Sequence, residues 1–235
     1  MRKNRRHEKI ENLTKIAMFV AIEAIICFVP FLGSIQIGPV VATLAMIPVI
    51  IVGMTYGTKY GTILGFCAGL FSFIWWTFID SSNPSALLFT PWNAYTSSYR
   101  SYWPIIICFV PRILTGTVAG LLSTYFKKIN NSRISSVLFG TYFSGDTKNE
   151  NNPQKRKNVF SYFLVGIISS LINTILVLFG TYLLWGKKYA SLAGMEYDVL
   201  LKTIMSIVLT NGIFEALVGG IVGSAVTFTL TNIKK

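Results

Sequence analysis

Residues 40–79 read VVATLAMIPVIIVGMTYGTKYGTILGFCAGLFSFIWWTFI and contain one charged side chain, that of Lys59. The run is far longer than the ~20 apolar residues that cross the hydrocarbon core of a bilayer. Tyr56-Gly57-Thr58-Lys59 offers a turn near its middle, because glycine and polar residues interrupt the apolar sequence there. We therefore predict that residues 40–57 and 60–79 form two membrane helices joined by a short turn.

The rest of the chain repeats this pattern. Of its 235 residues 52% are hydrophobic and 13% charged, whereas a soluble domain has about 25% charged residues. Further long apolar segments predict helices at 13–32, 103–126, 160–185 and 199–231. The expected fold is all-α: a polytopic bundle of six transmembrane helices in the cell membrane. It forms one domain over residues 13–231, after a basic tail at 1–12.

Lysine and arginine are divided unevenly between the two sides that six spans define. With both termini on one side, that side receives most of the 21 basic residues, including those of the 127–158 loop. Cytoplasmic loops carry such an excess. We therefore predict cytoplasmic termini, a cytoplasmic 127–158 loop and an outer 80–102 loop. The net charge of +12 then reflects membrane orientation, and we expect no nucleic-acid partner.

Motifs of several enzyme classes are absent from the sequence. It has no G-x-x-x-x-G-K-[ST] phosphate loop, and its single histidine, His7, lies in the basic tail. Histidine-dependent hydrolysis and zinc sites are thereby excluded from the membrane segments. We predict no enzymatic activity, no cofactor and no metal. An intramembrane enzyme using Glu23 with Glu215, or a scaffold subunit without ligand, stays a remote alternative.

Ionisable groups at membrane depth are costly and usually functional or paired. Glu23, Arg112 and Glu215 qualify, and a rise of ~1.5 Å per residue places Arg112 and Glu215 at similar depth. Asn173 falls at that depth too, and Asn211 precedes Glu215 by one helical turn. These four residues of the fourth to sixth helices are predicted to line or border a polar cavity. The alternative is a structural Arg112–Glu215 ion pair, with Glu23 either protonated or sharing Arg112.

The outer 80–102 loop is rich in aromatic and polar side chains. Such residues favour a lid that offers stacking surface, hydrogen bonds and one cation to an anionic or amphipathic solute. The alternative is an aromatic belt at the bilayer interface. The candidate lid residues are Trp92, Asn93, Tyr99 and Arg100.

Small residues recur at four-residue spacing in several predicted spans, which allows close approach of helices. For the glycines we expect packing inside the bundle. Ala17 and Ala21 of the first helix have two open interpretations, internal packing or a surface for a partner protein. The glycines in question are Gly57, Gly61, Gly65, Gly69, Gly116, Gly120, Gly219 and Gly223.

The order of these segments resembles that of the substrate-binding S component of energy-coupling factor (ECF) vitamin transporters, over about residues 10–231. Lys15-Ile16-Ala17-Met18-Phe19-Val20-Ala21 is similar to the A-x-x-x-A signature of the first helix in that family. Other segments resemble its pantothenate and cobalamin branch: Ile37-Gly38-Pro39, Ile47-Pro48-Val49-Ile50-Ile51, Tyr56-Gly57-Thr58-Lys59-Tyr60-Gly61, Val110-Pro111-Arg112-Ile113-Leu114, Asn173-Thr174 and Asn211-Gly212-Ile213-Phe214-Glu215.

The resemblance implies a six-helix bundle that binds one vitamin from outside. Pantothenate suits the residue types best, with cobalamin or another vitamin as the alternative. It also implies partners, namely a transmembrane coupling protein and two cytoplasmic ATPase subunits, which would supply the missing ATP chemistry. Ala17 and Ala21 would contact the coupling protein, and the bundle would topple within the membrane to release its cargo.

Overall fold

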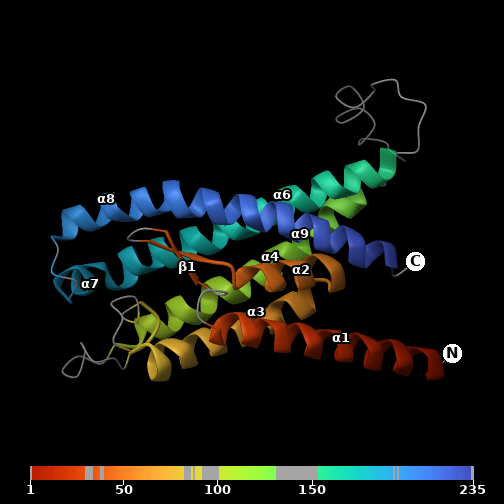
Figure 1. Ribbon diagram of the computed structural model, residues 1–235, viewed down its shortest axis with the longest axis horizontal. Helices are drawn as coiled ribbons and strands as arrows, with labels where there is room; N and C mark the ends of the chain where they lie inside the picture. The colour runs from red at the N-terminus through yellow and green to blue at the C-terminus, as the bar shows by residue number, and fades with distance from the viewer. Residues whose placement is uncertain are drawn as a thin grey trace.

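The computed structural model describes residues 2–29, 34–37, 40–81, 86, 88–91, 101–130, 153–192, 194 and 196–233. Most helices run along the long axis of the molecule, and α1 begins and α9 ends at the same end of it (Figure 1). The α-helices are α1 (Arg2–Phe28), α2 (Met46–Tyr56), α3 (Thr58–Ile74), α4 (Trp103–Asn130), α6 (Pro153–Gly180), α7 (Gly186–Leu192), α8 (Tyr197–Ile207) and α9 (Ile213–Ile233). The π-helical segments are η1 (Trp75–Ile79), η3 (Thr181–Trp185) and η4 (Val208–Gly212).

Four helical segments among the described residues are long and apolar enough to cross a membrane. They are Thr58–Ile79, Trp103–Ile129, Val159–Leu184 and Tyr197–Thr231, close to four of the predicted spans. Large hydrophobic side chains are exposed along them, as at Phe66, Leu121 and Ile221. Water disfavours so much exposed apolar surface, and a lipid environment accepts it. The chain is a multi-pass membrane protein.

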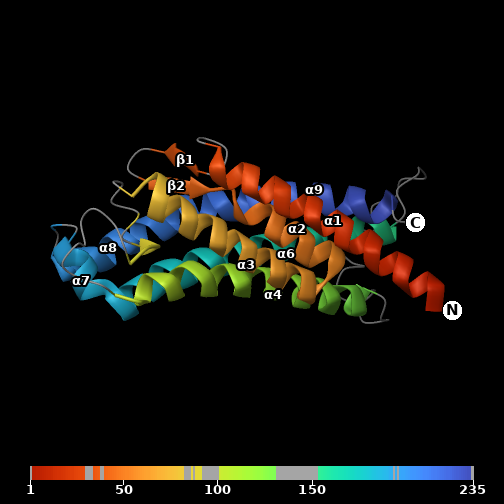
Figure 2. The same cartoon turned by 90° about the horizontal axis from the view of Figure 1, so that it is seen from below.

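The predicted helix over residues 40–57 is wrong in its first part. Residues Val40–Thr43 form strand β2, which pairs antiparallel with β1 (Ser34–Ile37), so the described part of the chain is helical with one two-stranded ribbon. Val40, Val41 and Thr43 are β-branched and favour a strand. The four residues of β2 cover about 13 Å, and the 11 of α2 about 16 Å. Ribbon and helix follow one another along the long axis (Figure 2).

Other boundaries move by a few residues. α1 begins at Arg2, so the helix continues through the segment predicted as a basic tail, and it ends at Phe28. α4 runs to Asn130 and α6 begins at Pro153, which shortens the predicted 127–158 loop at both ends. The last predicted span divides into α8, η4 and α9, which follow one another without interruption.

Helix α2 occupies the centre of the bundle. It contacts α1, α3, α4, α6 and α9, and nearly all of its side chains are buried. A helix that is apolar on every side belongs in such a position. Two hydrogen bonds join the C-terminal end of α2 to α4: Ser123 Oγ and Lys127 Nζ both donate to the Met54 carbonyl oxygen, at 3.0 and 3.1 Å.

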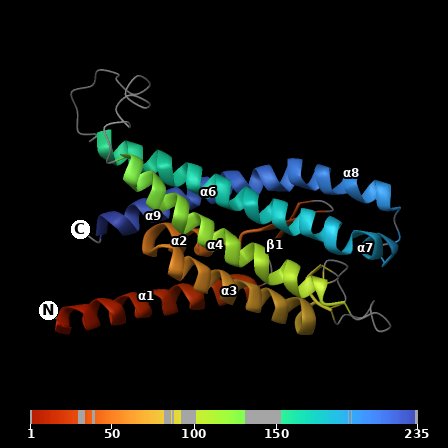
Figure 3. The same cartoon turned by 180° about the vertical axis from the view of Figure 1, so that it is seen from behind.

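Glycines let α3 and α4 pack backbone to backbone, as the sequence predicted (Figure 3). A Cβ atom on Gly116 would lie 2.1 Å from the Gly61 carbonyl oxygen, and one on Gly65 would lie 2.3 Å from that of Arg112. The turn between α2 and α3 is at Gly57, whose φ of 93° favours glycine. The position of Arg112 is therefore fixed by the glycine face of α3.

Candidate functional site

Buried polar side chains from α4, α6 and η4 lie at one level of the bundle. α4 and α6 run in opposite directions, and a Cβ on Gly180 of α6 would lie 3.8 Å from Ile107 of α4. Arg112, about 7.5 Å further along α4, is therefore level with the stretch of α6 that holds Asn173. On the next helix, a Cβ on Gly212 would lie 3.3 Å from Thr174 Cγ2.

The side chain of Arg112 is buried, and only part of its hydrogen-bonding capacity is used. Its Nη1 donates to the Cys108 carbonyl at 2.8 Å and to the Ile107 carbonyl at 3.4 Å. Pro111 has no N–H to offer the Ile107 carbonyl, so the arginine takes the place of that helical donor. The guanidinium carbon lies 4.6 Å from the centre of the Phe89 ring. Nε is buried without a hydrogen-bond partner.

Glu23 of α1 is completely buried, with 0% of its surface exposed. Its Oε1 accepts a weak hydrogen bond from the Cys27 thiol at 3.6 Å, and its Oε2 has no partner. The charge of Arg112 acts on this carboxyl group, as the sequence had left open. The two side chains are nevertheless not among the salt bridges of the described residues.

Glu215 takes part in a different contact from the ion pair that was the alternative interpretation of the sequence. Thr174 Oγ1 donates to Glu215 Oε2 at 2.9 Å, and the Arg112–Glu215 ion pair is not formed. Equal depth on two helices does not fix the direction of a side chain about the helix axis, and Arg112 points to carbonyls of its own helix. Asn173 Oδ1 and Asn211 Nδ2 are buried without partners, and Asn211 lies in the widened turn of η4.

The four predicted lid residues lie outside the described residues: Trp92, Asn93, Tyr99 and Arg100. The lid therefore stays a prediction. The described beginning of the same loop does reach the site, since Phe89 contacts Arg112 and stacks on Trp76 with ring centres 5.8 Å apart. Next to it, Thr90 is fully buried and accepts a 2.8 Å hydrogen bond from Thr77.

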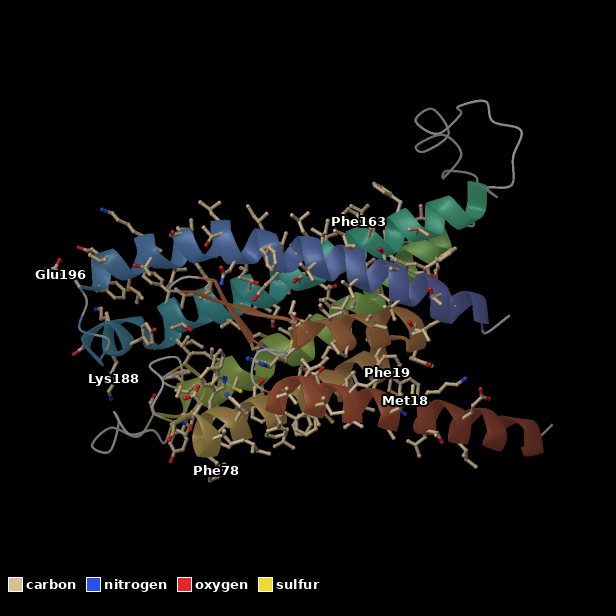
Figure 4. All side chains as sticks on the ribbon, in the orientation of Figure 1. Met18, Phe19, Phe78, Phe163, Lys188 and Glu196 are labelled. Atoms are coloured by element: carbon tan, nitrogen blue, oxygen red, sulfur yellow. The ribbon has the colours of Figure 1, made fainter. Side chains whose placement is uncertain are left out.

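Ala17 and Ala21 lie on the exposed side of α1, so internal packing of these alanines is excluded within the described bundle. The neighbouring Met18 is exposed as well, whereas Phe19 is buried against the core (Figure 4). Lys188 of α7 and Glu196, which precedes α8, lie at the end of the molecule away from the start of α1 and the end of α9 (Figure 4).

The site predicted from the sequence did not include Phe89 or Glu23. An aromatic residue in a loop gives no signal of its own that it will stack on a buried guanidinium. Glu23 did give a signal, because a carboxylate at membrane depth is costly. It lacked a cationic neighbour in sequence, and which groups of other helices come near it is decided by the tertiary fold.

A lipid-compatible exterior around a buried arginine, carboxyl groups and amides is typical of membrane proteins whose function depends on polar groups between their helices, among them transporter subunits. The chain belongs to the family "ECF transporter, substrate-specific component", whose sequence profile matches residues 11–231. It is thus a component of a transport system that works with an ECF module, and not an enzyme.

Two relatives give this similarity more detail. The chain is 28% identical over 211 residues to the pantothenic acid transporter PanT of Lactococcus lactis subsp. cremoris, covering 89% of this chain and 94% of that protein. It is 24% identical over 231 residues to the pantothenate transporter PanT of Leuconostoc mesenteroides subsp. mesenteroides, covering 97% of this chain and 95% of that protein.

Proposed function

We propose that this chain captures pantothenate from outside the cell and delivers it inward when it is docked on an ATP-driven ECF module. The observation that carries the proposal is the similarity, over nearly their whole lengths, to two proteins named as pantothenate transporters. The predicted preference for pantothenate over cobalamin or another vitamin agrees with it.

The chemistry of the site fits this solute. Pantothenate has a carboxylate, a secondary amide and two hydroxyl groups. Arg112 Nη1 is used by backbone carbonyls, whereas the edge that carries Nε matches the geometry of a carboxylate. Asn173 presents an unpartnered acceptor and Asn211 an unpartnered donor, the complement of an amide group. We propose that Glu215 completes the site beside Thr174, and that Trp92, Asn93, Tyr99 and Arg100 close over it.

The test is calorimetric titration of the purified chain with pantothenate, together with mass spectrometry of any small molecule that co-purifies. Saturable pantothenate binding supports the proposal. Binding of cobalamin or another vitamin in its place would refute the substrate and keep the transporter class. Recovery of lipid alone, with no vitamin bound, would favour a scaffold subunit.

We also propose six membrane crossings with both termini in the cytoplasm, the first made by α1 and the second by β2 together with α2. The combined length of β2 and α2 is close to the ~30 Å of a hydrocarbon core, and α1 begins at the end of the molecule where α9 ends. In a cysteine-free background, a cysteine at Ser97 should react with an impermeant reagent from outside, and one at Asn151 should not. The reverse labelling would refute this topology.

The partners we propose are a transmembrane coupling protein and two cytoplasmic ATPase subunits, with the outward alanines of α1 on the coupling protein. Ala17→Trp and Ala21→Trp add bulk where close helix approach is needed. Pantothenate binding should persist while uptake and co-purification of the coupling protein fall. Ala225→Trp, an exposed alanine on α9, is the matched control and should leave uptake intact. Normal uptake in both α1 variants would remove the alanine surface from the docking interface.

A further inference from the structure

We infer that Glu23 of α1 is a solute-binding residue, whose Oε2 accepts a hydrogen bond from an alcohol hydroxyl of the solute that Arg112 holds by its carboxylate. The inference rests on the proposed function for the identity of the solute. It adds a helix to the site, because the predicted site residues lie in the 92–100 segment and on α4, α6, η4 and α9.

The first observation is that the carboxyl group of Glu23 is buried and that one of its oxygen atoms has no hydrogen-bond partner. Glu23 has 0% of its surface exposed, and Oε2 has no hydrogen-bond partner. Native proteins leave few buried polar atoms unpaired, because removing such a group from water without a partner is costly. The atom therefore needs a donor that is not part of the described bundle.

The second observation is that Arg112 is also buried with an unsatisfied polar atom, since its Nε has no hydrogen-bond partner. The two side chains are near enough to interact electrostatically, yet they form no salt bridge. The bonds of Nη1 to Cys108 and Ile107 hold the guanidinium on its own helix. One molecule with an acidic group for Arg112 and a hydroxyl for Glu23 would satisfy both atoms at once.

The third observation is that the one hydrogen bond Glu23 does accept comes from a poor donor. The Cys27 thiol donates to Oε1 at 3.6 Å, and Cys67 of α3, another thiol, is near enough for an electrostatic interaction. Thiols are weak donors. A hydroxyl is a stronger donor, and pantothenate has two.

Glu23 lies on the same helix, α1, as the alanines of the proposed docking surface. Ala21 is exposed and Glu23, two residues later, is buried. Two residues correspond to about 200° around an α-helix, so the two positions face opposite sides. A solute held by Glu23 would thereby order the helix whose outer side carries Ala17 and Ala21.

The experiment compares Glu23→Ala with Glu11→Gln, which removes an exposed carboxylate from the same helix. The ligands are pantothenate and an analogue that keeps the carboxylate and amide but has hydrogen in place of both hydroxyls. Glu23→Ala should weaken pantothenate binding by about 2- to 13-fold, the range for an ordinary hydrogen bond. It should leave the affinity for the analogue unchanged, and Glu11→Gln should alter neither.

Wild-type pantothenate affinity in Glu23→Ala, or an equal loss for both ligands, would overturn the inference. If Glu23→Ala does not fold, Glu23→Gln serves instead: it keeps the shape and one acceptor oxygen, and a smaller loss confined to pantothenate is expected. If the wild-type chain does not bind pantothenate, the proposed substrate is wrong. The inference is then decided by the vitamin that co-purifies with wild type: a lower recovery from purified Glu23→Gln supports it, and equal recovery contradicts it.

Discussion

Gly65 of α3 controls where Arg112 lies. A methyl group at this position would meet the Arg112 carbonyl oxygen at 2.3 Å and its carbonyl carbon at 2.9 Å. Ordinary contact begins at 3.4 Å, so the backbones of α3 and α4 must separate by about 1.1 Å at this level. Both atoms belong to the backbone and cannot rotate away. Gly65→Ala should therefore displace the site residue itself.

Overpacking of this kind costs about 1–3 kcal/mol. In a chain of this size each kcal/mol lowers Tm by roughly 2–4 °C, so a fall of about 2–12 °C is expected. Binding should suffer as well, because a displacement of about 1 Å is enough to spoil the geometry of a polar site. Pantothenate affinity should fall at least tenfold.

Gly180→Ala is the matched control, because its added methyl would meet only Ile107 Cγ1, at an ordinary 3.8 Å. Alanine is also the better helix former by about 0.8–1.0 kcal/mol, so this variant should be as stable as wild type or more so. Thermal unfolding in detergent and calorimetric titration measure the two effects. A Gly65→Ala protein with wild-type Tm and affinity would refute the reasoning about the α3–α4 crossing.

Further predictions concern the basic residues. Arg112→Ala should lower both expression and pantothenate binding, measured by yield and titration, and Glu215→Gln should give no rescue, since the two residues are not paired; recovery in the double variant would contradict the described contacts. Lys127→Met should cost about 0.5–1.5 kcal/mol through loss of its bond to the Met54 carbonyl, whereas Lys128→Met should leave Tm unchanged. Arg100→Ala should weaken pantothenate binding by about 10- to 150-fold without lowering Tm, and unchanged affinity would reject a cationic lid.

The long helices could be predicted from the sequence because continuous apolar runs with charged or turn-forming ends leave few alternatives. The start of α4 at Trp103 and the break at Gly57 are examples. The helix predicted over residues 40–45 is wrong because a continuous apolar run has no periodicity that separates a buried strand from a helix. The ribbon partner at Ser34–Ile37 lies between the predicted spans 13–32 and 40–57, where no element was predicted.

Burial of the polar side chains Arg112, Asn173 and Asn211 follows from their place in apolar runs, but their pairing could not be predicted. Depth along a helix follows from residue number. The direction of a side chain about the helix axis depends on packing, which is why Arg112 bonds carbonyls of its own helix and Glu215 bonds Thr174. The widened turn at Val208–Gly212 adds to the difficulty, because it rotates Asn211 relative to a regular helix and has no signature in the residues themselves.

The central position of α2 has a consequence for how the chain is made. Ribosomes deliver β2 and α2 to the insertion machinery before α4, α6 and α9 exist, and α2 is too short to settle across lipid alone. A strand exposed to lipid would also leave its backbone N–H and C=O groups unsatisfied. We therefore expect the translocon or a chaperone to keep residues 34–56 away from lipid until α4, α6 and α9 have been synthesised. Packing around α2 is complete only once α9 has been synthesised, so a chain truncated before α9 would be a substrate for membrane quality control.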